Sequence, residues 1–173
     1  ESVFASWGAR AFATVAEQEN ADGDLGFEFH THRSPLAVER VRAGRCHAAL
    51  VAGEGRASSE LEIEVLGYEE MLVVPAALDR SVIRSDRRGG SVDVWTIEEA
   101  ASTWKSIASR IASMRRSGLV DLRVAGRLES FASLVQFARA GFGHALVPRG
   151  VALAMGLQAK DLWRIRADRK GTP

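Results

Sequence analysis

Strand-like and helix-like patterns alternate along most of the 173 residues. In residues 121–148, DLRVAG predicts a strand, ESFASLVQFARAG predicts a helix that Ser130 could cap and that ends at Gly141, and GHALVP predicts a second strand. The same reasoning predicts strands over 25–31, 46–52, 61–67, 70–75, 92–96 and 161–166, and helices over 4–17, 35–43, 97–113 and 150–156. Such alternation favours an α/β fold with a largely parallel sheet.

Two of the apolar strand patterns end in proline, at Pro75 and Pro148. If the chain crosses between two lobes at these points, residues 76–147 form one lobe. Residues 1–75 and 148–173 then form the other. A cleft between two lobes is a common place for a small ligand, so the sequence predicts a binding site there.

The overall charge and the cysteine count exclude several classes of protein. The formal net charge is +1, so this chain has no strong electrostatic footprint for nucleic acid. Cys46 is the only cysteine, so no internal disulfide can form. No apolar run is long enough to cross a bilayer, and no secretion signal is visible. Because the chain begins with Glu1 and enters a helical pattern almost at once, we expect a domain of a longer protein.

The segment HTHRSPLAVERVRAGRCHAALVAG (30–53) places Ser34 and Pro35 at a helix start directly after a predicted strand. Serine is a favourable N-cap and proline suits the first turn, which is a purely structural explanation. The free N–H groups of such a start also attract an anion. From the residues alone, both interpretations stay open. A similar pattern, Thr96 followed by Glu99, predicts that Thr96 caps the helix over 97–113.

The histidines near this segment raise the alternative of a metal site. His30 and His32 share one face of a predicted strand, and Cys46 and His47 begin another strand that could lie beside it. Neighbouring strand residues point to opposite faces, so only one of Cys46 and His47 could join. The ligand count stays short of a recognisable site, so we expect no metal and no cofactor.

Catalytic patterns are also weak. The chain has no Gly-x-Ser-x-Gly elbow and no Walker lysine loop. Gly141 and Gly143 do not continue into a dinucleotide fingerprint and precede a strand instead of a helix. We therefore expect a protein that binds a ligand and is not an enzyme.

Three segments resemble, in order and spacing, the effector-binding domain of LysR-type transcriptional regulators. They are RSPLAVERVRAGRCHAALVAG (33–53), LEIEVLGYEEMLVVPA (61–76) and LESFASLVQFARAGFGHALVPRGVA (128–152). The resemblance implies a type II periplasmic-binding-protein-like fold, with two Rossmann-like lobes and a ligand cleft between them. This chain departs from the family pattern at His47, where an acidic residue is usual. The family's winged helix-turn-helix would precede Glu1.

The resemblance also implies a site, because family members bind a small effector against hydroxyls at helix starts between the lobes. By position, Ser34 and Arg33 would bind an anionic effector, and Phe131 would form an apolar wall. The implied ligand-binding residues are Ser2, Arg33, Ser34, Ser102, Thr103, Ser130 and Phe131.

The resemblance further implies a cytoplasmic bacterial regulator that forms a homodimer or homotetramer. Its partners would be a small carboxylate or amino-acid-like effector and, through the missing N-terminal domain, DNA, without any membrane. The alternative is a periplasmic solute-binding protein of the same fold.

Overall fold

The computed structural model describes residues Gly8, Ala13, Thr14 and Glu17 and the ranges 28–53, 59–81, 91–116 and 120–165. Most of the predicted helix over 4–17 and the predicted site residue Ser2 lie outside the described residues. The same holds for the beginning of the strand predicted over 25–31.

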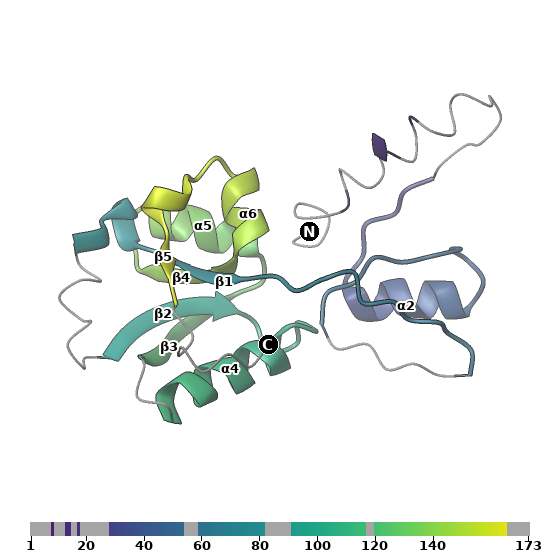
Figure 1. Cartoon of the computed structure of the whole chain (residues 1–173), viewed down its shortest axis with the longest axis horizontal. Coiled ribbons are helices and arrows are strands. Elements are labelled where there is room, and N and C mark those ends of the chain that lie inside the picture. Colours follow the sequence, from purple (N-terminus) through teal and green to yellow (C-terminus); the bar gives the residue numbers. More distant parts are fainter. Residues whose placement is uncertain are drawn as a thin grey trace.

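A five-stranded sheet organises the described chain, in the strand order β3-β2-β4-β1-β5 (Figure 1). The strands are β1 (Met71–Val74), β2 (Ser91–Ile97), β3 (Asp121–Leu128), β4 (His144–Pro148) and β5 (Trp163–Arg164). β2 runs parallel to β3 and β4, whereas β1 runs antiparallel to β4 and β5. The expected largely parallel sheet is therefore mixed, because the two strands that end at prolines are antiparallel neighbours.

Helices cover both faces of this sheet. They are α4 (Trp104–Arg116), α5 (Phe131–Arg139) and α6 (Arg149–Ala154), with short 3-10 turns η2 (Ala76–Leu78) and η3 (Ala159–Asp161). Figure 1 shows α5 and α6 on one side of the sheet and α4 on the other. Right-handed crossovers explain this, since β2 to β3 and β3 to β4 move in opposite directions across the sheet.

The hydrophobic core lies between the sheet and these helices. Its largest fully buried apolar side chains are leucines from β1, β3, α5 and β4 and from the residue after η3. They are Leu72, Leu122, Leu134, Leu146 and Leu162. We call the described residues 71–165 the sheet lobe.

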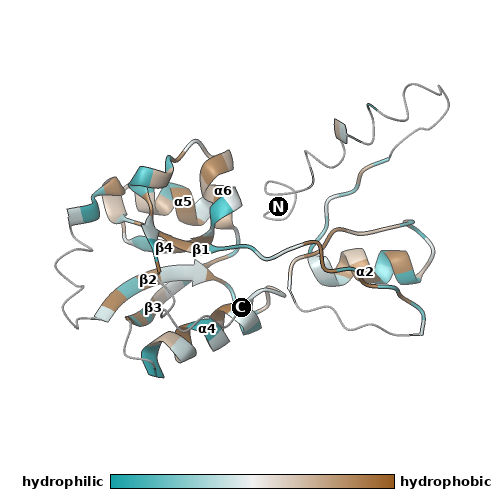
Figure 2. Ribbon diagram, viewed as in Figure 1, coloured by the Kyte–Doolittle hydropathy of each residue, from teal (hydrophilic) through white to brown (hydrophobic). Residues whose placement is uncertain are grey.

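By contrast, α2 (Ser34–Arg42) has no buried residue. It stands apart with the extended segments around it, and we call the described residues in 28–66 the α2 lobe (Figures 1 and 2).

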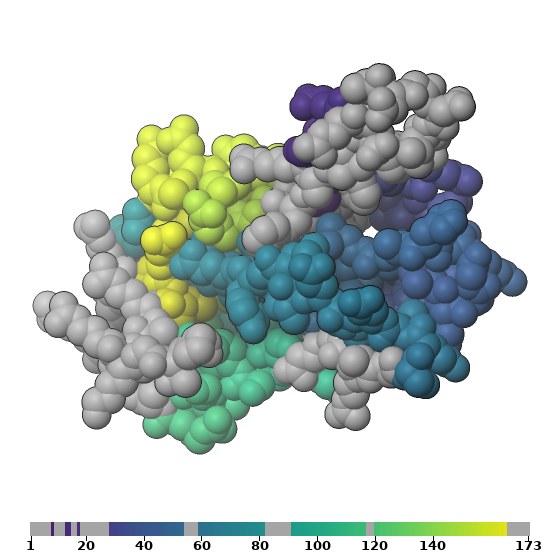
Figure 3. All heavy atoms as spheres, turned by 45° about the vertical axis from the view of Figure 1, so that its right-hand side comes forward, coloured from purple at the N-terminus to yellow at the C-terminus, as the bar shows by residue number. Residues whose placement is uncertain are grey.

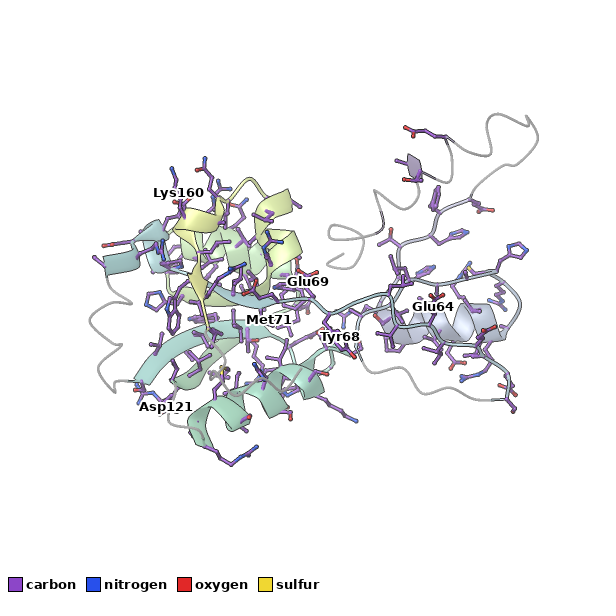
Figure 4. The ribbon with its side chains drawn as sticks, viewed as in Figure 1. Glu64, Tyr68, Glu69, Met71, Asp121 and Lys160 are labelled. Atoms are coloured by element: carbon purple, nitrogen blue, oxygen red, sulfur yellow. The ribbon has the colours of Figure 1, made fainter. Side chains whose placement is uncertain are left out.

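The connection between the lobes is the segment that leads into β1. Figure 4 places Glu64 in the α2 lobe, Met71 in the sheet lobe and Tyr68 between them. The Tyr68 side chain is exposed. In the space-filling view this teal-blue segment runs across the front of the molecule between the two lobes (Figure 3).

The sheet groups strands that the sequence interpretation assigned to different lobes. β5, from the range 148–173, pairs with β1, and both share the sheet with β2 and β3. After Pro148 the chain turns into α6, which packs on β4 and β1 of the same sheet. Strands from both predicted ranges therefore share one sheet, and the division of the chain into lobes at Pro75 and Pro148 stays a prediction.

Three predicted strands of the α2 lobe are not strands in the described residues. The described parts of 25–31, 46–52 and 61–67 carry no strand ladder, apart from a single bridge residue at Leu61. A strand needs a neighbour to satisfy its backbone groups, and alternation alone does not supply one. Apolar side chains of 61–67 are accordingly exposed, among them Ile63, Val65 and Leu66.

The predicted helix start at Thr96 is also wrong. Thr96 is fully buried inside β2, and α4 begins only at Trp104. The strand continues because Thr96 and Ile97 pair with Arg127 and Leu128 of β3. By contrast, the helix end at Gly44 is confirmed, since Gly44 follows α2 with a φ of 66°.

Gly126→Ala is expected to lower the free energy of unfolding by about 1–3 kcal/mol, the usual effect of overpacking. A Cβ atom at Gly126 would lie 2.5 Å from the Trp95 ring, so the ring or the strand must shift. Urea denaturation followed by circular dichroism measures the change. Ala125→Ser, at the exposed neighbouring position, is the control and should stay within about 0.5 kcal/mol. Equal stability of both variants would contradict the close contact.

Candidate functional site

The three parallel strands end at one edge of the sheet. β2 and β3 end side by side, because Ile97 pairs with Leu128 and the Glu98 N–H donates to the Leu128 carbonyl at 3.0 Å. α5 and α6 begin within three residues of the ends of β3 and β4. In open α/β sheets, ligands bind at the carboxyl ends of the strands. The candidate site is therefore this edge, where the α2 lobe meets the sheet lobe.

Ser34 reaches this junction from the start of α2. It is the first helical residue and Arg33 precedes the helix, so the prediction that Ser34 is the N-cap is wrong. Its hydroxyl oxygen instead accepts a hydrogen bond from the Ala52 N–H at 3.3 Å. Ser34 thus ties the helix start to the segment that follows α2.

Ser102 approaches the same residue from the sheet lobe. Its hydroxyl donates to the Ala52 carbonyl oxygen at 2.8 Å. The two chains touch closely here, because a Cβ atom at Gly53 would lie 3.0 Å from the Ser102 carbonyl oxygen. Two of the predicted site residues, Ser34 and Ser102, therefore meet at the peptide groups of Ala52.

Thr103 lies directly before α4. Its carbonyl accepts the Ile107 N–H at 3.1 Å, the first hydrogen bond of the helix. The sequence interpretation had set Ser102 and Thr103 inside a helix that began near Thr96. The longer β2 moves the helix start, and both hydroxyl residues come to its N-terminal end.

Arg33 also contacts the sheet lobe. Its Nη1 lies 2.5 Å from Oε1 of Glu98, and the side chains are 63% and 26% exposed. Sequence reasoning singled out Arg33 and missed Glu98, because Glu98 fell inside the helix predicted over 97–113. The signal that could have found it is its place directly after a strand at the carboxyl edge.

A second charged pair lies beside this one. Arg127 Nη2 is 2.7 Å from Oε1 of Glu99, and the Arg127 guanidinium lies 4.8 Å from the ring centroid of Trp104. Trp104 is partly buried, packs against the core and also offers a ring face to Arg127.

Ser130 and Phe131 lie where β3 passes into α5. The prediction that Ser130 caps this helix is confirmed, because its oxygen accepts the N–H groups of Ala132 and Ser133 at 3.1 and 3.4 Å. Phe131 is only 7% exposed and belongs to the core cluster. The described contacts of both residues are thus structural, and their part in ligand binding stays a prediction.

The histidines of the α2 lobe stack on each other. The ring centroids of His30 and His32 are 6.0 Å apart, and Nε2 of His30 lies 3.0 Å from Oε1 of Glu28. The side chain of Cys46 is partly buried. Within the described ranges, no group of three or more His, Cys, Asp or Glu side chains is placed to hold a metal ion. None of the described helices is long and apolar enough to cross a membrane.

Several solved structures have the same fold as this chain. The effector-binding domain of QuiR in complex with shikimate matches with a TM-score of 0.69 and 11% identity, over 98% of this chain and 78% of that one. The BenM effector-binding domain with benzoate gives a TM-score of 0.61 and 14% identity over 94% and 71%. Full-length CbnR bound to its target DNA gives 0.61 and 14% over 92% and 55%. The fold is the type II periplasmic-binding-protein-like fold of effector-binding domains.

The sequence itself identifies the family. The LysR substrate binding domain family matches residues 11–162, and the chain belongs to this family. No curated protein matches the chain. Family membership supports an effector-sensing regulatory role and not that of a transport receptor.

Proposed function

We propose that this chain is the effector-sensing domain of a bacterial LysR-type transcription factor and binds a small carboxylate where the α2 lobe meets the sheet lobe. One observation carries the proposal. Ser34 of one lobe and Ser102 of the other both bond to Ala52, and Arg33, the residue before Ser34, pairs with Glu98 across the lobes. A ligand held there would contact both lobes at once.

The charge at this point favours an anion. Arg33 directly precedes α2, whose first turn carries no acidic residue and whose free N–H groups add partial positive charge. A guanidinium binds a carboxylate through two parallel N–H donors, and 63% of the Arg33 side chain is open to solvent. The ligands named with two similar domains, shikimate and benzoate, are both carboxylates. Ser2, Thr103, Ser130 and Phe131 remain proposed as further ligand contacts.

The remaining parts of the function concern the whole regulator. The chain spans 55% of the length of CbnR, whose full-length form was solved with its target DNA. We propose that a further domain of the present protein binds DNA and that the intact regulator is a cytoplasmic homodimer or homotetramer without enzymatic activity. Effector binding can change DNA binding only if the effector prefers one arrangement of the lobes.

A thermal-shift screen followed by calorimetric titration tests the binding. Benzoate and shikimate are the first probes within a panel of small carboxylates, and benzamide is the uncharged match for benzoate. A carboxylate present at 100 times its Kd should stabilise the chain by about 2.7 kcal/mol. Equal stabilisation by benzamide and benzoate, or none by any carboxylate of the panel, would contradict an anion site.

Ser34→Ala is expected to weaken binding of a carboxylate about 2- to 10-fold, which corresponds to one hydrogen bond of about 0.5–1.5 kcal/mol. Ser34 is not an N-cap, so its replacement removes only the hydrogen bond from the Ala52 N–H to its hydroxyl. The free energy of unfolding should therefore fall by about 1 kcal/mol, the usual contribution of one such bond. Calorimetric titration gives the affinity. Ser106→Ala, on the exposed side of α4, is the matched control. An unchanged affinity would leave Ser34 with a structural role only.

A further inference from the structure

The groups that would bind a carboxylate already hold groups of the protein. Arg33 of the α2 lobe binds the Glu98 carboxylate of the sheet lobe, with 2.5 Å between Nη1 and Oε1. Ser34 accepts the Ala52 N–H, and Ser102 donates to the Ala52 carbonyl. In this arrangement the chain supplies its own carboxylate at the position where an anionic ligand would meet Arg33.

The Arg33–Glu98 pair joins the two lobes, whereas the neighbouring charged pairs of the described residues lie within one lobe. Arg42 and Glu60 pair within the α2 lobe, at 3.1 Å. Arg127 and Glu99 pair within the sheet lobe, at 2.7 Å. Arg33–Glu98 connects the two lobes, and the Ser102–Ala52 hydrogen bond connects them beside it.

The position and exposure of this pair allow a ligand carboxylate to replace Glu98 on Arg33. Glu98 is 26% exposed, and its backbone N–H is fixed to β3 through the Leu128 carbonyl, so the carboxylate stays at the sheet edge. Arg33 is largely solvent-exposed, and exposed ion pairs are weak and screened by salt. An incoming carboxylate can therefore replace Glu98 on Arg33 without leaving a buried charge unpaired.

We propose that Glu98 is an internal competitor of the effector and that the Arg33–Glu98 pair, with the Ser102–Ala52 hydrogen bond, is a latch that holds the ligand-free lobes together. The effector's carboxylate takes Arg33 from Glu98 and so removes one of the two contacts of the latch, which leaves the Ser102–Ala52 hydrogen bond to hold the lobes alone. This inference rests on the proposed binding of a carboxylate at the same junction. It adds that the ligand-free form is latched. Only molecules with an open latch can bind, so the apparent affinity for the effector falls as the latched fraction rises.

The first test measures the distance between the lobes without any ligand. Spin labels at Ala43→Cys in the α2 lobe and Ser109→Cys on α4, in a Cys46→Ser background, report it by pulsed electron resonance. Glu98→Gln, Glu98→Ala and Arg33→Gln should each lengthen and broaden the distance distribution. The double exchange Arg33→Glu with Glu98→Arg should restore it.

The matched control is Glu99→Gln, which removes the neighbouring carboxylate but affects a pair within the sheet lobe. It should leave the distribution as it is. An unchanged distribution in Glu98→Gln and Glu98→Ala, or the same change in Glu99→Gln, would overturn the latch. So would a double exchange that behaves like the single variants.

The second test asks whether a carboxylate competes with Glu98. Acetate, as the simplest carboxylate, should shift the wild-type distribution at a lower concentration than chloride of equal ionic strength, and Glu98→Gln should be insensitive to it. For a carboxylate that binds in the screen, Glu98→Gln should raise the affinity about 3- to 10-fold. Acetate acting no better than chloride, or an affinity that Glu98→Gln leaves unchanged, would overturn the competition.

The two tests separate this inference from the proposed function. If carboxylates bind but the Glu98 variants leave the distance and the affinity unchanged, the latch is wrong and the binding site stands. If the variants open the lobes but no carboxylate of the panel binds, the function is wrong, the competition falls with it, and the latch alone stands.

Discussion

Replacing Trp95 by alanine is expected to lower the free energy of unfolding by about 3–5 kcal/mol, as for other large aromatic residues removed from a packed site. Trp95 lies in β2, at the centre of the three parallel strands. Its ring lies against Gly126 of β3 and Gly143 before β4, and it contacts Phe137 of α5 with ring centroids 4.4 Å apart. No alanine side chain can fill a space that three elements share.

The measurement is urea denaturation followed by circular dichroism at 25 °C, combined with the Gly126→Ala variant in a double-mutant cycle. Gly126→Ala is destabilising only because its new Cβ meets the Trp95 ring, so it should be nearly neutral in the Trp95→Ala background. The coupling energy should be about 1–3 kcal/mol. Additive effects of the two changes would show that the ring does not fill the space over Gly126.

How far the sequence predicts this fold depends on whether a segment has a pairing partner. The segment 121–148 was predicted in full, because its strands, its Ser130 cap and its Gly141 end all reflect local chemistry that the sheet then preserves. The segments 46–52 and 61–67 have comparable apolar patterns but carry no ladder in the described residues. Pairing is a property of two segments, and a pattern reports only one of them.

Thr96 shows that strand pairing can also override a local helix signal. Thr-Ile-Glu-Glu is a good helix start by local rules. However, threonine is β-branched and equally suited to a strand, and the pairing of Ile97 with Leu128 carried β2 past it. This changes the site, because α4 begins at Trp104 and Ser102 and Thr103 therefore lie at its N-terminal end and not inside it.

The candidate site could be predicted only in part, and for a physical reason. Arg33, Ser34 and Ser102 were named by family resemblance, and the structure brings all three to the same junction. Glu98 and Ala52 were not named. Their roles depend on contacts between segments far apart in the chain, and no local signal marks the backbone of an alanine as the meeting point of two hydroxyls.

Phe131→Ala is the second change with a large expected effect, a loss of about 3–5 kcal/mol in the free energy of unfolding. This is a large part of the ~5–15 kcal/mol by which domains are stable. Phe131 begins α5, is 7% exposed and packs in the core behind the carboxyl edge of the sheet. Urea denaturation measures the loss, and Ala132→Gly, one residue later in the same helix, should lower stability by only about 1 kcal/mol.

Phe131→Leu separates the packing role of this residue from its proposed contact with the ligand. Leucine keeps most of the apolar volume, so the fold should survive with a loss of about 1–2 kcal/mol. Because leucine also forms an apolar wall at this position, we expect this variant to bind a carboxylate with an affinity within about 2-fold of the wild type, less than 0.5 kcal/mol. A tenfold loss in a stably folded Phe131→Leu would mean that the ligand requires the aromatic ring itself and that an apolar wall of similar volume at the start of α5 is not sufficient.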